Sequence, residues 1–309
     1  MKSFDALEKV LIDPPSMSAL VDVLTELRRV WDKQIPKKPT KQLIMDSMVW
    51  FCSVCNDVVR SSAHLYGNRP KEILSRPIKG MLREEEEMQL SDIVKATEAL
   101  IGRKDYYGIL SDMFEYTALS IAEAIKGTRS KGGSRVELYE SWGDQKDKLE
   151  ELKDMLVLFF AERVEQSEFD DYLGKLYMMS NTSSSKAGQF FTPFNVSELT
   201  AELSVNSMNT ADPVITLHEP SCGSGGMVIA AAKKLWKEGI NYTERLLVEC
   251  GDIDRRCVHM TYIQLSLFGI PAVIFQRDTL TLQTWDEWHT PALVFNWLKF
   301  RKYVKGETK

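Results

Sequence analysis

The second half of the chain alternates between short apolar runs and segments with the spacing of an amphipathic helix. The apolar runs have the length of buried strands, and they occupy residues 213–219, 245–253, 272–278 and 292–297. A helical segment separates the first run from the second and the second from the third. Such alternation is typical of a parallel sheet joined by right-handed crossovers. We therefore predict an α/β fold for this part of the chain.

The preceding residues have helical periodicity and predict separate regions. We expect a helical N-terminal domain over residues 1–135, a helical connector over 136–185 and the α/β core over 186–309. The stretch "KGTRSKGGS" at 126–134 is rich in Gly and Ser and has no apolar residue, which favours a linker. The alternative is a loop that contacts phosphate groups through its basic residues, Lys126, Arg129, Lys131 and Arg135.

Composition narrows the class of protein. Of the 309 residues, 44% are hydrophobic and 27% are charged, as in ordinary globular proteins, and we predict no membrane segment. The five cysteines have no regular spacing, which favours a reduced, cytoplasmic protein. Cys52 and Cys55 form a CxxC in an apolar segment without a second ligand pair, so we predict no metal site. The net charge of −5 argues against a generally basic nucleic-acid binder but allows a local basic patch.

Three glycines follow the first predicted strand, where the chain turns into a helix. The sequence "HEPSCGSGG" places them at Gly223, Gly225 and Gly226. Glycines at this point let the backbone approach a ligand closely, and open α/β sheets bind ligands at the carboxyl ends of their strands. The spacing matches neither the dinucleotide-binding GxGxxG nor a P-loop. Neither NAD nor ATP is therefore the expected ligand.

Acidic residues follow the second and third predicted strands. Asp252 and Asp254 come at the end of the second strand, and Asp278 at the end of the third. A carboxylate at the second position can accept hydrogen bonds from ribose hydroxyls, and one at the third can meet the exocyclic amine of an adenine. Each acid alone can instead be a helix N-cap. Together with the glycines, the three positions indicate a nucleoside cofactor across the strand ends.

The motifs in this half of the chain resemble one known family. The series "GQFFTP", "EPSCGSGG", "GDID" and "RDTL" is similar to that of N6-adenine DNA methyltransferases, above all the modification subunits of type I restriction systems. In the helix before the first motif, "FDDYLGKLYM", the residues that match the family are Asp171, Leu173, Gly174 and Tyr177. The resemblance covers residues 170 to 300 and implies a Rossmann-like, S-adenosylmethionine-dependent methyltransferase core.

The resemblance also implies which residues bind S-adenosylmethionine. The loop with Phe191 and Thr192 is expected to fold over the methionine end of the cofactor, and the glycine loop to pass beneath it. Asp278 is expected at the adenine amine, and either Asp252 or Asp254 at the ribose. The complete implied set is Gln189, Phe190, Phe191, Thr192, Pro193, Glu219, Pro220, Ser221, Gly223, Gly225, Gly226, Asp252, Asp254 and Asp278.

The family performs its chemistry with an Asn/Asp-Pro-Pro-aromatic turn after the fourth strand, whose polar groups accept the hydrogens of the adenine amine. This chain has "VFNWLKF" instead. Asn296 aligns with the acceptor, and Trp297 or Phe300 is expected to stack on a base flipped out of the duplex. Both prolines are missing, so we expect slow transfer. The alternative is a strand that merely runs into a basic tail.

The expected function is transfer of a methyl group from S-adenosylmethionine to adenine N6 in DNA. The sequence ends at Lys309, before the further strands of the family's core, so we expect a truncated core with an open sheet edge. The first alternative is a catalytically impaired, cofactor-binding regulator or partner subunit of a DNA modification system. A further alternative is an RNA or protein acceptor. Expected partners are DNA and either a specificity or partner subunit or a second copy of the chain.

Overall fold

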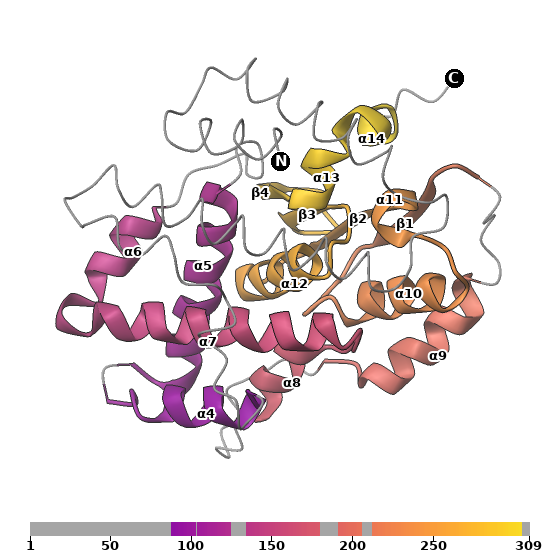
Figure 1. The fold of residues 1–309 in the computed structure, drawn as a ribbon. Helices are drawn as coiled ribbons and strands as arrows, with labels where there is room; N and C mark the ends of the chain where they lie inside the picture. The colour runs from indigo at the N-terminus through magenta and orange to yellow at the C-terminus, as the bar shows by residue number, and fades with distance from the viewer. Residues whose placement is uncertain (1–87, 103, 125–133, 180–190, 206–211, 305–309) are drawn as a thin grey trace, which may run out of the picture. The chain divides into compact units, whose positions relative to one another are not determined.

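The structure of the chain, a computed structural model, describes residues 88–102, 104–124, 134–179, 191–205 and 212–304 (Figure 1). The CxxC of Cys52 and Cys55 and most of the predicted N-terminal domain lie outside these residues. Nearly all of the basic stretch at 126–134 also lies outside them. The predicted boundaries between domains stay a prediction.

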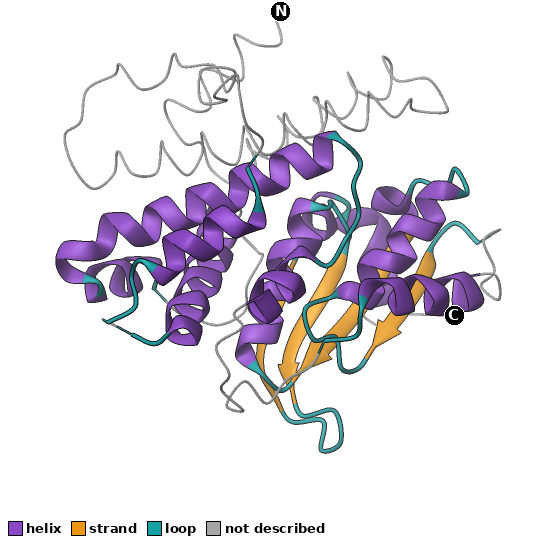
Figure 2. Ribbon diagram, turned by 90° about the horizontal axis from the view of Figure 1, so that it is seen from below, coloured by secondary structure: helices purple, strands orange, loops and turns teal. Residues whose placement is uncertain are grey.

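A four-stranded sheet forms the centre of the α/β part, with strand order β1-β2-β3-β4 (orange in Figure 2). The strands β1 (Ile215–Glu219), β2 (Leu246–Asp252) and β3 (Ala272–Arg277) run parallel. The last strand, β4 (Thr284–His289), pairs antiparallel with β3. The three parallel strands and the α/β class confirm the prediction from the alternating pattern.

The predicted fourth strand at 292–297 is wrong. These residues lie in the short helix α13 (Pro291–Phe295) and at the start of α14 (Trp297–Val304). Pro291 stands at the first helical position after Thr290, where its fixed backbone angle favours a helix start. The actual fourth strand was missed because "TWDEWH" carries charged residues and has no continuous apolar run.

Helices cover both faces of the sheet. On one face, α12 (Arg255–Leu267) packs its His259 and Tyr262 rings against Trp288 of β4, with ring centroids 5.3 and 4.8 Å apart. On the other face, α13 and α14 place Leu293 and Phe300 against the first residues of the strands in a buried cluster with Val214, Leu247 and Val273. Side chains alternate between the faces of a strand, so the two sets of helices lie on opposite sides.

The helices α9 (Phe194–Val205), α10 (Gly226–Lys237) and α11 (Tyr242–Arg245) flank the first two strands: α9 precedes β1, and α10 and α11 lie between β1 and β2. α10 connects β1 to β2 and packs against α9. The ion pairs Lys233–Glu198 and Lys234–Glu202 join these two helices. A single turn, α11, leads into β2.

A group of helices before the sheet packs against α12. It consists of α4 (Leu90–Glu98), α5 (Tyr106–Ala124), α6 (Arg135–Ser141), the 3-10 turn η4 (Gly143–Gln145), α7 (Lys146–Glu165) and α8 (Tyr172–Met179). In Figure 1, α5, α7 and α12 lie side by side, and contacts join all three pairs. Arg255 of α12 forms an ion pair with Glu115 of α5. Among the described residues, no helix is long and apolar enough to cross a membrane.

An aromatic cluster joins this helical group to the end of α12. Phe268 stacks on Phe169, with centroids 5.4 Å apart and planes 11° apart, and it meets the edge of Phe160 at 5.9 Å. Tyr172 of α8 meets Phe160 at 5.7 Å. Such ring pairs add to the free energy of apolar burial. The start of α8 is therefore fixed to the α/β core, which matters for the site described below.

Thr290 is expected to be important for the stability of the sheet. Its side chain is fully buried, donates to the Ile270 carbonyl at 2.7 Å and accepts from the Ala272 N–H at 2.9 Å. Thr290→Val keeps the shape but leaves both backbone groups unpaired, so we expect it to lower the free energy of unfolding by about 2 kcal/mol. Urea unfolding measures this loss. Thr284→Val, at an exposed position of β4, is the control, and equal losses in both variants would contradict this account.

Candidate cofactor site at the carboxyl edge of the sheet

The glycine loop between β1 and α10 has a backbone that only glycine adopts readily. Gly223 and Gly225 have φ angles of 54° and 95°, in the left-handed region. A Cβ atom on Gly223 would lie 3.1 Å from the Phe191 ring. The Cys222 N–H donates to the Gly251 carbonyl at 2.9 Å and ties the loop to β2. The predicted need for glycines at this turn is therefore explained by both backbone angle and close approach.

Asp252, the last residue of β2, lies directly beside this loop. Its Oδ2 accepts a hydrogen bond from the Gly223 N–H at 2.9 Å, and its Oδ1 accepts one from the Asp254 N–H at 2.9 Å. The residue is only 8% exposed. The structure thus brings together the first and second predicted cofactor motifs. A carboxylate oxygen accepts more than one hydrogen bond, so both oxygens retain capacity for a ligand.

Asp254 has a different environment. It is the N-cap of α12, where its side chain accepts from the Arg256 N–H at 2.8 Å. The Arg256 guanidinium also contacts both Asp254 oxygens, the closest pair at 2.6 Å, and donates to the Tyr177 hydroxyl at 3.2 Å. Asp254 is therefore a helix cap with an ion-paired carboxylate, which is the alternative that its sequence position allowed.

Asp278 follows β3 at the same edge. Its Oδ1 accepts from the backbone N–H groups of Leu280 at 2.9 Å and Thr281 at 3.3 Å. These hydrogen bonds, with that from Leu280 first, lower the pKa of the Asp278 carboxyl, so it is ionised at neutral pH. The neighbouring Thr279 hydroxyl donates to the Pro220 carbonyl at 2.6 Å and joins the β3 loop to the loop after β1.

The remaining predicted cofactor residues lie in two segments. Glu219 accepts from the Ser221 N–H at 3.2 Å at the start of the glycine loop. Phe191 contacts the edge of the Tyr177 ring, with centroids 5.5 Å apart, and lies against Gly223. Thr192 and Pro193 are exposed and lead into α9, whereas Gln189 and Phe190 lie outside the described residues.

The predicted catalytic residues do not lie at the carboxyl edge of the sheet. Asn296 is the C-cap of α13, and its amide donates to the Ala292 carbonyl at 2.9 Å and to the Thr243 carbonyl at 3.5 Å. Thr243 belongs to α11, which enters the amino end of β2. Trp297 stacks on His289 at the end of β4, with centroids 6.2 Å apart. His289 in turn pairs with Val273 near the start of β3.

Phe300, the third predicted catalytic residue, also lies away from the cofactor motifs. It is fully buried against the first residues of the strands, in the cluster with Val214, Leu247 and Val273. From Val273 to Arg277 the strand advances four residues, or about 13 Å. The antiparallel β4 returns the chain to the amino edge before α13 begins, so the three residues and the cofactor motifs occupy opposite edges. The catalytic assignment of Asn296, Trp297 and Phe300 stays a prediction, and this geometry argues against it.

Apolar side chains that the sequence reasoning missed lie beside the two acids. Ile253 directly follows Asp252 and is 61% exposed, and Leu280 lies two residues after Asp278 and is 95% exposed. Large apolar groups exposed beside polar acceptors are typical of ligand sites. The signal in the sequence was an apolar residue in the loop after each acid. Thr261 and Gln264 of α12, which contact the glycine loop, were also missed.

Two other predictions concern metal and phosphate. Among the described residues, no group of three or more His, Cys, Asp or Glu side chains could hold a metal ion. Arg135 is the one member of the predicted basic set that the structure describes, and its Nε lies 2.8 Å from Glu123 Oε2 while its Nη1 donates to the Tyr116 hydroxyl. This arginine is thus engaged within the protein.

Comparison with known proteins agrees with the predicted resemblance. Residues 169–302 match the family model described as N-6 DNA Methylase. The "Type I restriction enzyme MpnII methylase subunit" of Mycoplasma pneumoniae is 24% identical over 209 residues, which is 63% of this chain and 38% of that protein. The chain therefore spans less than half the length of this relative. The predicted similarity to this family is confirmed.

A solved structure was also found. It is that of a candidate class I S-adenosylmethionine-dependent methyltransferase from Listeria monocytogenes, with 17% identity and a TM-score of 0.32 over 60% of this chain and 54% of that one. The N-6 DNA Methylase match itself implies S-adenosylmethionine as the cofactor, and the carboxyl edge fits it through a close-approach glycine loop, carboxylates and exposed apolar groups.

Proposed function

We propose that this chain, whose residues 169–302 match the N-6 DNA Methylase family model, binds S-adenosylmethionine at the carboxyl edge of its sheet and uses it to methylate adenine N6 in DNA. The observation that carries the proposal is the meeting of three motifs at that edge. Asp252 holds the Gly223 N–H, and Thr279 beside Asp278 holds the Pro220 carbonyl. The cofactor supplies an activated methyl group, and the residues of the chain bind and orient it.

Asp252 is the residue we assign to the ribose. Both acids were open from the sequence, but Asp254 is neutralised by Arg256 and caps α12. Asp252 ends β2 and directs its carboxylate toward the glycine loop, where it already orders two backbone N–H groups. Two ribose hydroxyls would donate to the remaining lone pairs of this carboxylate.

The base and the methionine end are assigned to the neighbouring loops. The ionised Asp278 accepts from the adenine amine, and the exposed Ile253 and Leu280 cover the faces of the base. Phe191 closes over Gly223 at the methionine end, where its ring would lie 3.1 Å from a Cβ atom on the glycine. These loops would thereby exclude water from the methyl group that is transferred.

A second candidate function is favoured by the position of Asn296. An adenine amine is a poor nucleophile unless acceptors are fixed beside it, and the amide of Asn296 lies at the amino edge, against Ala292 and Thr243. Under this candidate, the chain binds the cofactor and regulates or completes a DNA modification system without transferring the methyl group itself. The relative from Mycoplasma pneumoniae is a methylase subunit. Under both candidates, the proposed protein partner is a specificity or partner subunit or a second copy of the chain, and the proposed nucleic acid is DNA.

Transfer of a labelled methyl group separates the two candidates. The protein is incubated with labelled S-adenosylmethionine and single- or double-stranded DNA, and N6-methyladenine is measured. The leading proposal predicts product that disappears in Asp252→Ala and persists in Asn296→Ala, because Asn296 is far from the cofactor edge. Cofactor binding without any product would overturn transfer and support the regulator. If Asn296→Ala also abolished the product while its cofactor affinity stayed unchanged, α13 and α14 would have to rearrange to form the acceptor site.

A further inference from the structure

Side chains outside the predicted cofactor set form hydrogen bonds with the glycine loop. The Gln264 amide donates to the Ser224 carbonyl at 2.7 Å and to Asp171 Oδ1 at 2.8 Å. The Ser224 hydroxyl donates to the other oxygen of Asp171. One turn earlier on α12, the Thr261 hydroxyl donates to the Gly223 carbonyl at 2.9 Å. The consecutive carbonyls of Gly223 and Ser224 are thus fixed by α12, and the Ser224 hydroxyl is fixed by Asp171.

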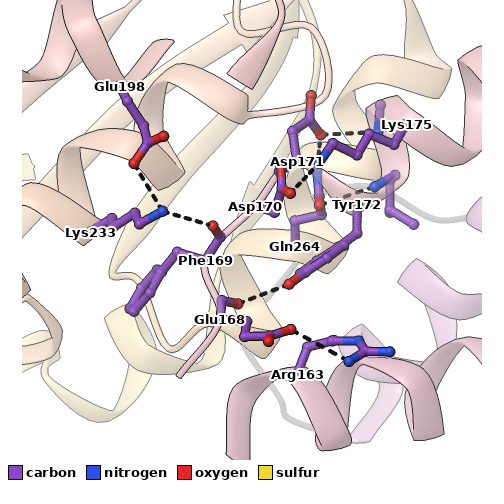
Figure 3. A network of polar contacts seen from close by, with 12 residues as sticks. Arg163, Glu168, Phe169, Asp170, Asp171, Tyr172, Lys175, Glu198, Lys233 and Gln264 are labelled. Atoms are coloured by element: carbon purple, nitrogen blue, oxygen red, sulfur yellow. Dashed lines mark hydrogen bonds and ion pairs between the residues drawn. The ribbon is translucent and has the colours of Figure 1, made fainter. Parts of the chain in front are cut away.

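This network is almost completely removed from water. Asp171, Ser224 and Gln264 are 4%, 2% and 0% exposed. A buried carboxylate is costly unless hydrogen-bonded, and Asp171 receives three donors, the third being the Gly174 N–H at 2.9 Å. Burial raises the pKa of the Asp171 carboxyl despite these donors. Figure 3 shows Asp171, just before α8, and Gln264 of α12 directed toward each other.

Two glycines provide the space for this carboxylate. A Cβ atom on Gly174 would lie 2.2 Å from Asp171 Oδ2 and 2.7 Å from the Ser224 hydroxyl oxygen. A Cβ atom on Gly226 would lie 3.1 Å from the same Asp171 oxygen. The Asp-x-Leu-Gly at the start of α8 and the last glycine of the loop are therefore parts of one packed arrangement.

We propose that Asp171 and Gln264 are positioning residues for the cofactor, which hold Ser224 and so fix the backbone of residues 223–226 in its binding conformation. Neither residue touches the cofactor. The inference rests on the proposed cofactor site and extends it, because it assigns a binding effect to side chains buried behind the loop. A loop fixed in advance avoids the ordering cost at the moment of binding.

The simpler alternative is that Asp171 only caps α8. It immediately precedes the helix, and its Oδ1 accepts from the Gly174 N–H, the position of an N-cap contact. Serine caps helices about as well as aspartate, but its hydroxyl is too short to reach both Ser224 and Gln264. Asparagine keeps the cap and retains the length of the side chain. The pair Asp171→Ser and Asp171→Asn therefore separates capping from positioning.

The test measures binding of S-adenosylhomocysteine by calorimetry and amide hydrogen exchange in the ligand-free protein. We expect Asp171→Asn to bind within about threefold of the wild type, and Asp171→Ser and Gln264→Met to bind about tenfold more weakly. In the two weak variants, exchange should become faster at residues 222–226 and stay unchanged in α5. Asp170→Asn is the matched control, because Asp170 lies next to Asp171 but pairs with Lys175 and keeps its acceptor for the Asp171 N–H.

Each outcome decides a separate question. Wild-type affinity and wild-type exchange in both Asp171→Ser and Gln264→Met would overturn the positioning role and leave the helix cap. If the wild type binds no cofactor, the proposed site fails, while faster loop exchange in the variants still supports the hold on the loop. If Asp171→Ser fails to fold, Gln264→Met decides alone, since it keeps Asp171 on the Gly174 N–H. Gln264 Oε1 also accepts from the Leu173 N–H at 3.2 Å, so exchange in α8 is measured beside that of the loop, and faster exchange confined to α8 would overturn the positioning role.

Discussion

Asp252→Ala is expected to weaken binding of S-adenosylmethionine at least about a hundredfold. The carboxylate would accept two ribose hydroxyls, and a hydrogen bond to a charged group contributes about 1.5 to 3 kcal/mol. The substitution also releases the Gly223 N–H, which Asp252 Oδ2 accepts at 2.9 Å in the structure. The loss should therefore combine a direct contact with a less ordered glycine loop. Calorimetry on purified protein measures it.

The neighbouring acid provides the control. Asp254→Ser keeps a good N-cap for α12 and removes the ion pair with Arg256, so we expect affinity within a few fold of the wild type. A cofactor analogue without the ribose 2′-hydroxyl separates the two contributions of Asp252. It should bind the wild type more weakly than the natural cofactor, and Asp252→Ala should no longer distinguish the two. A larger loss from Asp254→Ser than from Asp252→Ala would reverse the assignment.

Gly223→Val is expected to abolish cofactor binding. Its φ of 54° is strained for a β-branched residue, and its Cβ would lie 3.1 Å from Phe191, which must stay over the loop at the proposed methionine end. The added methyl groups would push the ring away or shift the loop. Calorimetry should show no heat with S-adenosylmethionine, while circular dichroism should show a folded protein.

Gly143→Val is matched to this variant. Gly143 has a φ of 58°, and a Cβ atom there would meet no atom within 4 Å. Both variants therefore carry similar backbone strain, but only Gly223→Val collides with the predicted site. We expect similar losses of thermal stability and an intact affinity in Gly143→Val. Equal loss of affinity in both variants would attribute the effect to general destabilisation.

The parts of the fold that depend on local pattern could be predicted from the sequence. The parallel strands β1 to β3 are apolar runs bounded by turn residues, and the glycines at 223 and 225 have the backbone angles that their position required. β4 could not be recognised, because Trp288 lies between the half-buried Glu287 and His289 and shares its buried face with the charged Asp286. Residues 292–297 are as apolar as a strand, and only Pro291 at the helix start distinguishes them. The choice depends on packing against Val214, Leu247 and Val273, which are distant in sequence.

The site was predictable to a similar degree. The acids and the glycines meet because parallel strands end at one edge, which is a consequence of topology. The sequence left open whether Asp252 or Asp254 faces the ligand. The contacts of Asp252 with Gly223 and of Asp254 with Arg256 distinguish them. It also gave no indication of Gln264, because a glutamine within a helix becomes informative only when its partners, Asp171 and Ser224, are known.

The separation of the two edges has a chemical consequence. β3 advances about 13 Å from Val273, at the edge where α13 begins, to Arg277, at the edge of the cofactor motifs. In this arrangement Asn296 does not reach an adenine amine placed next to the methyl group. Transfer by this chain therefore requires an acceptor site from other residues, or a partner that supplies it. Binding of the cofactor requires neither.

Calorimetric titration of the wild-type protein with S-adenosylhomocysteine tests the central claim most directly. The product analogue retains the adenine, the ribose and the amino acid end, and it avoids any methyl transfer during the measurement. We predict saturable binding with one site per chain, which is lost in Asp252→Ala and kept in Asp254→Ser. A folded wild-type protein that gives no binding heat at several temperatures would contradict the cofactor site at the carboxyl edge.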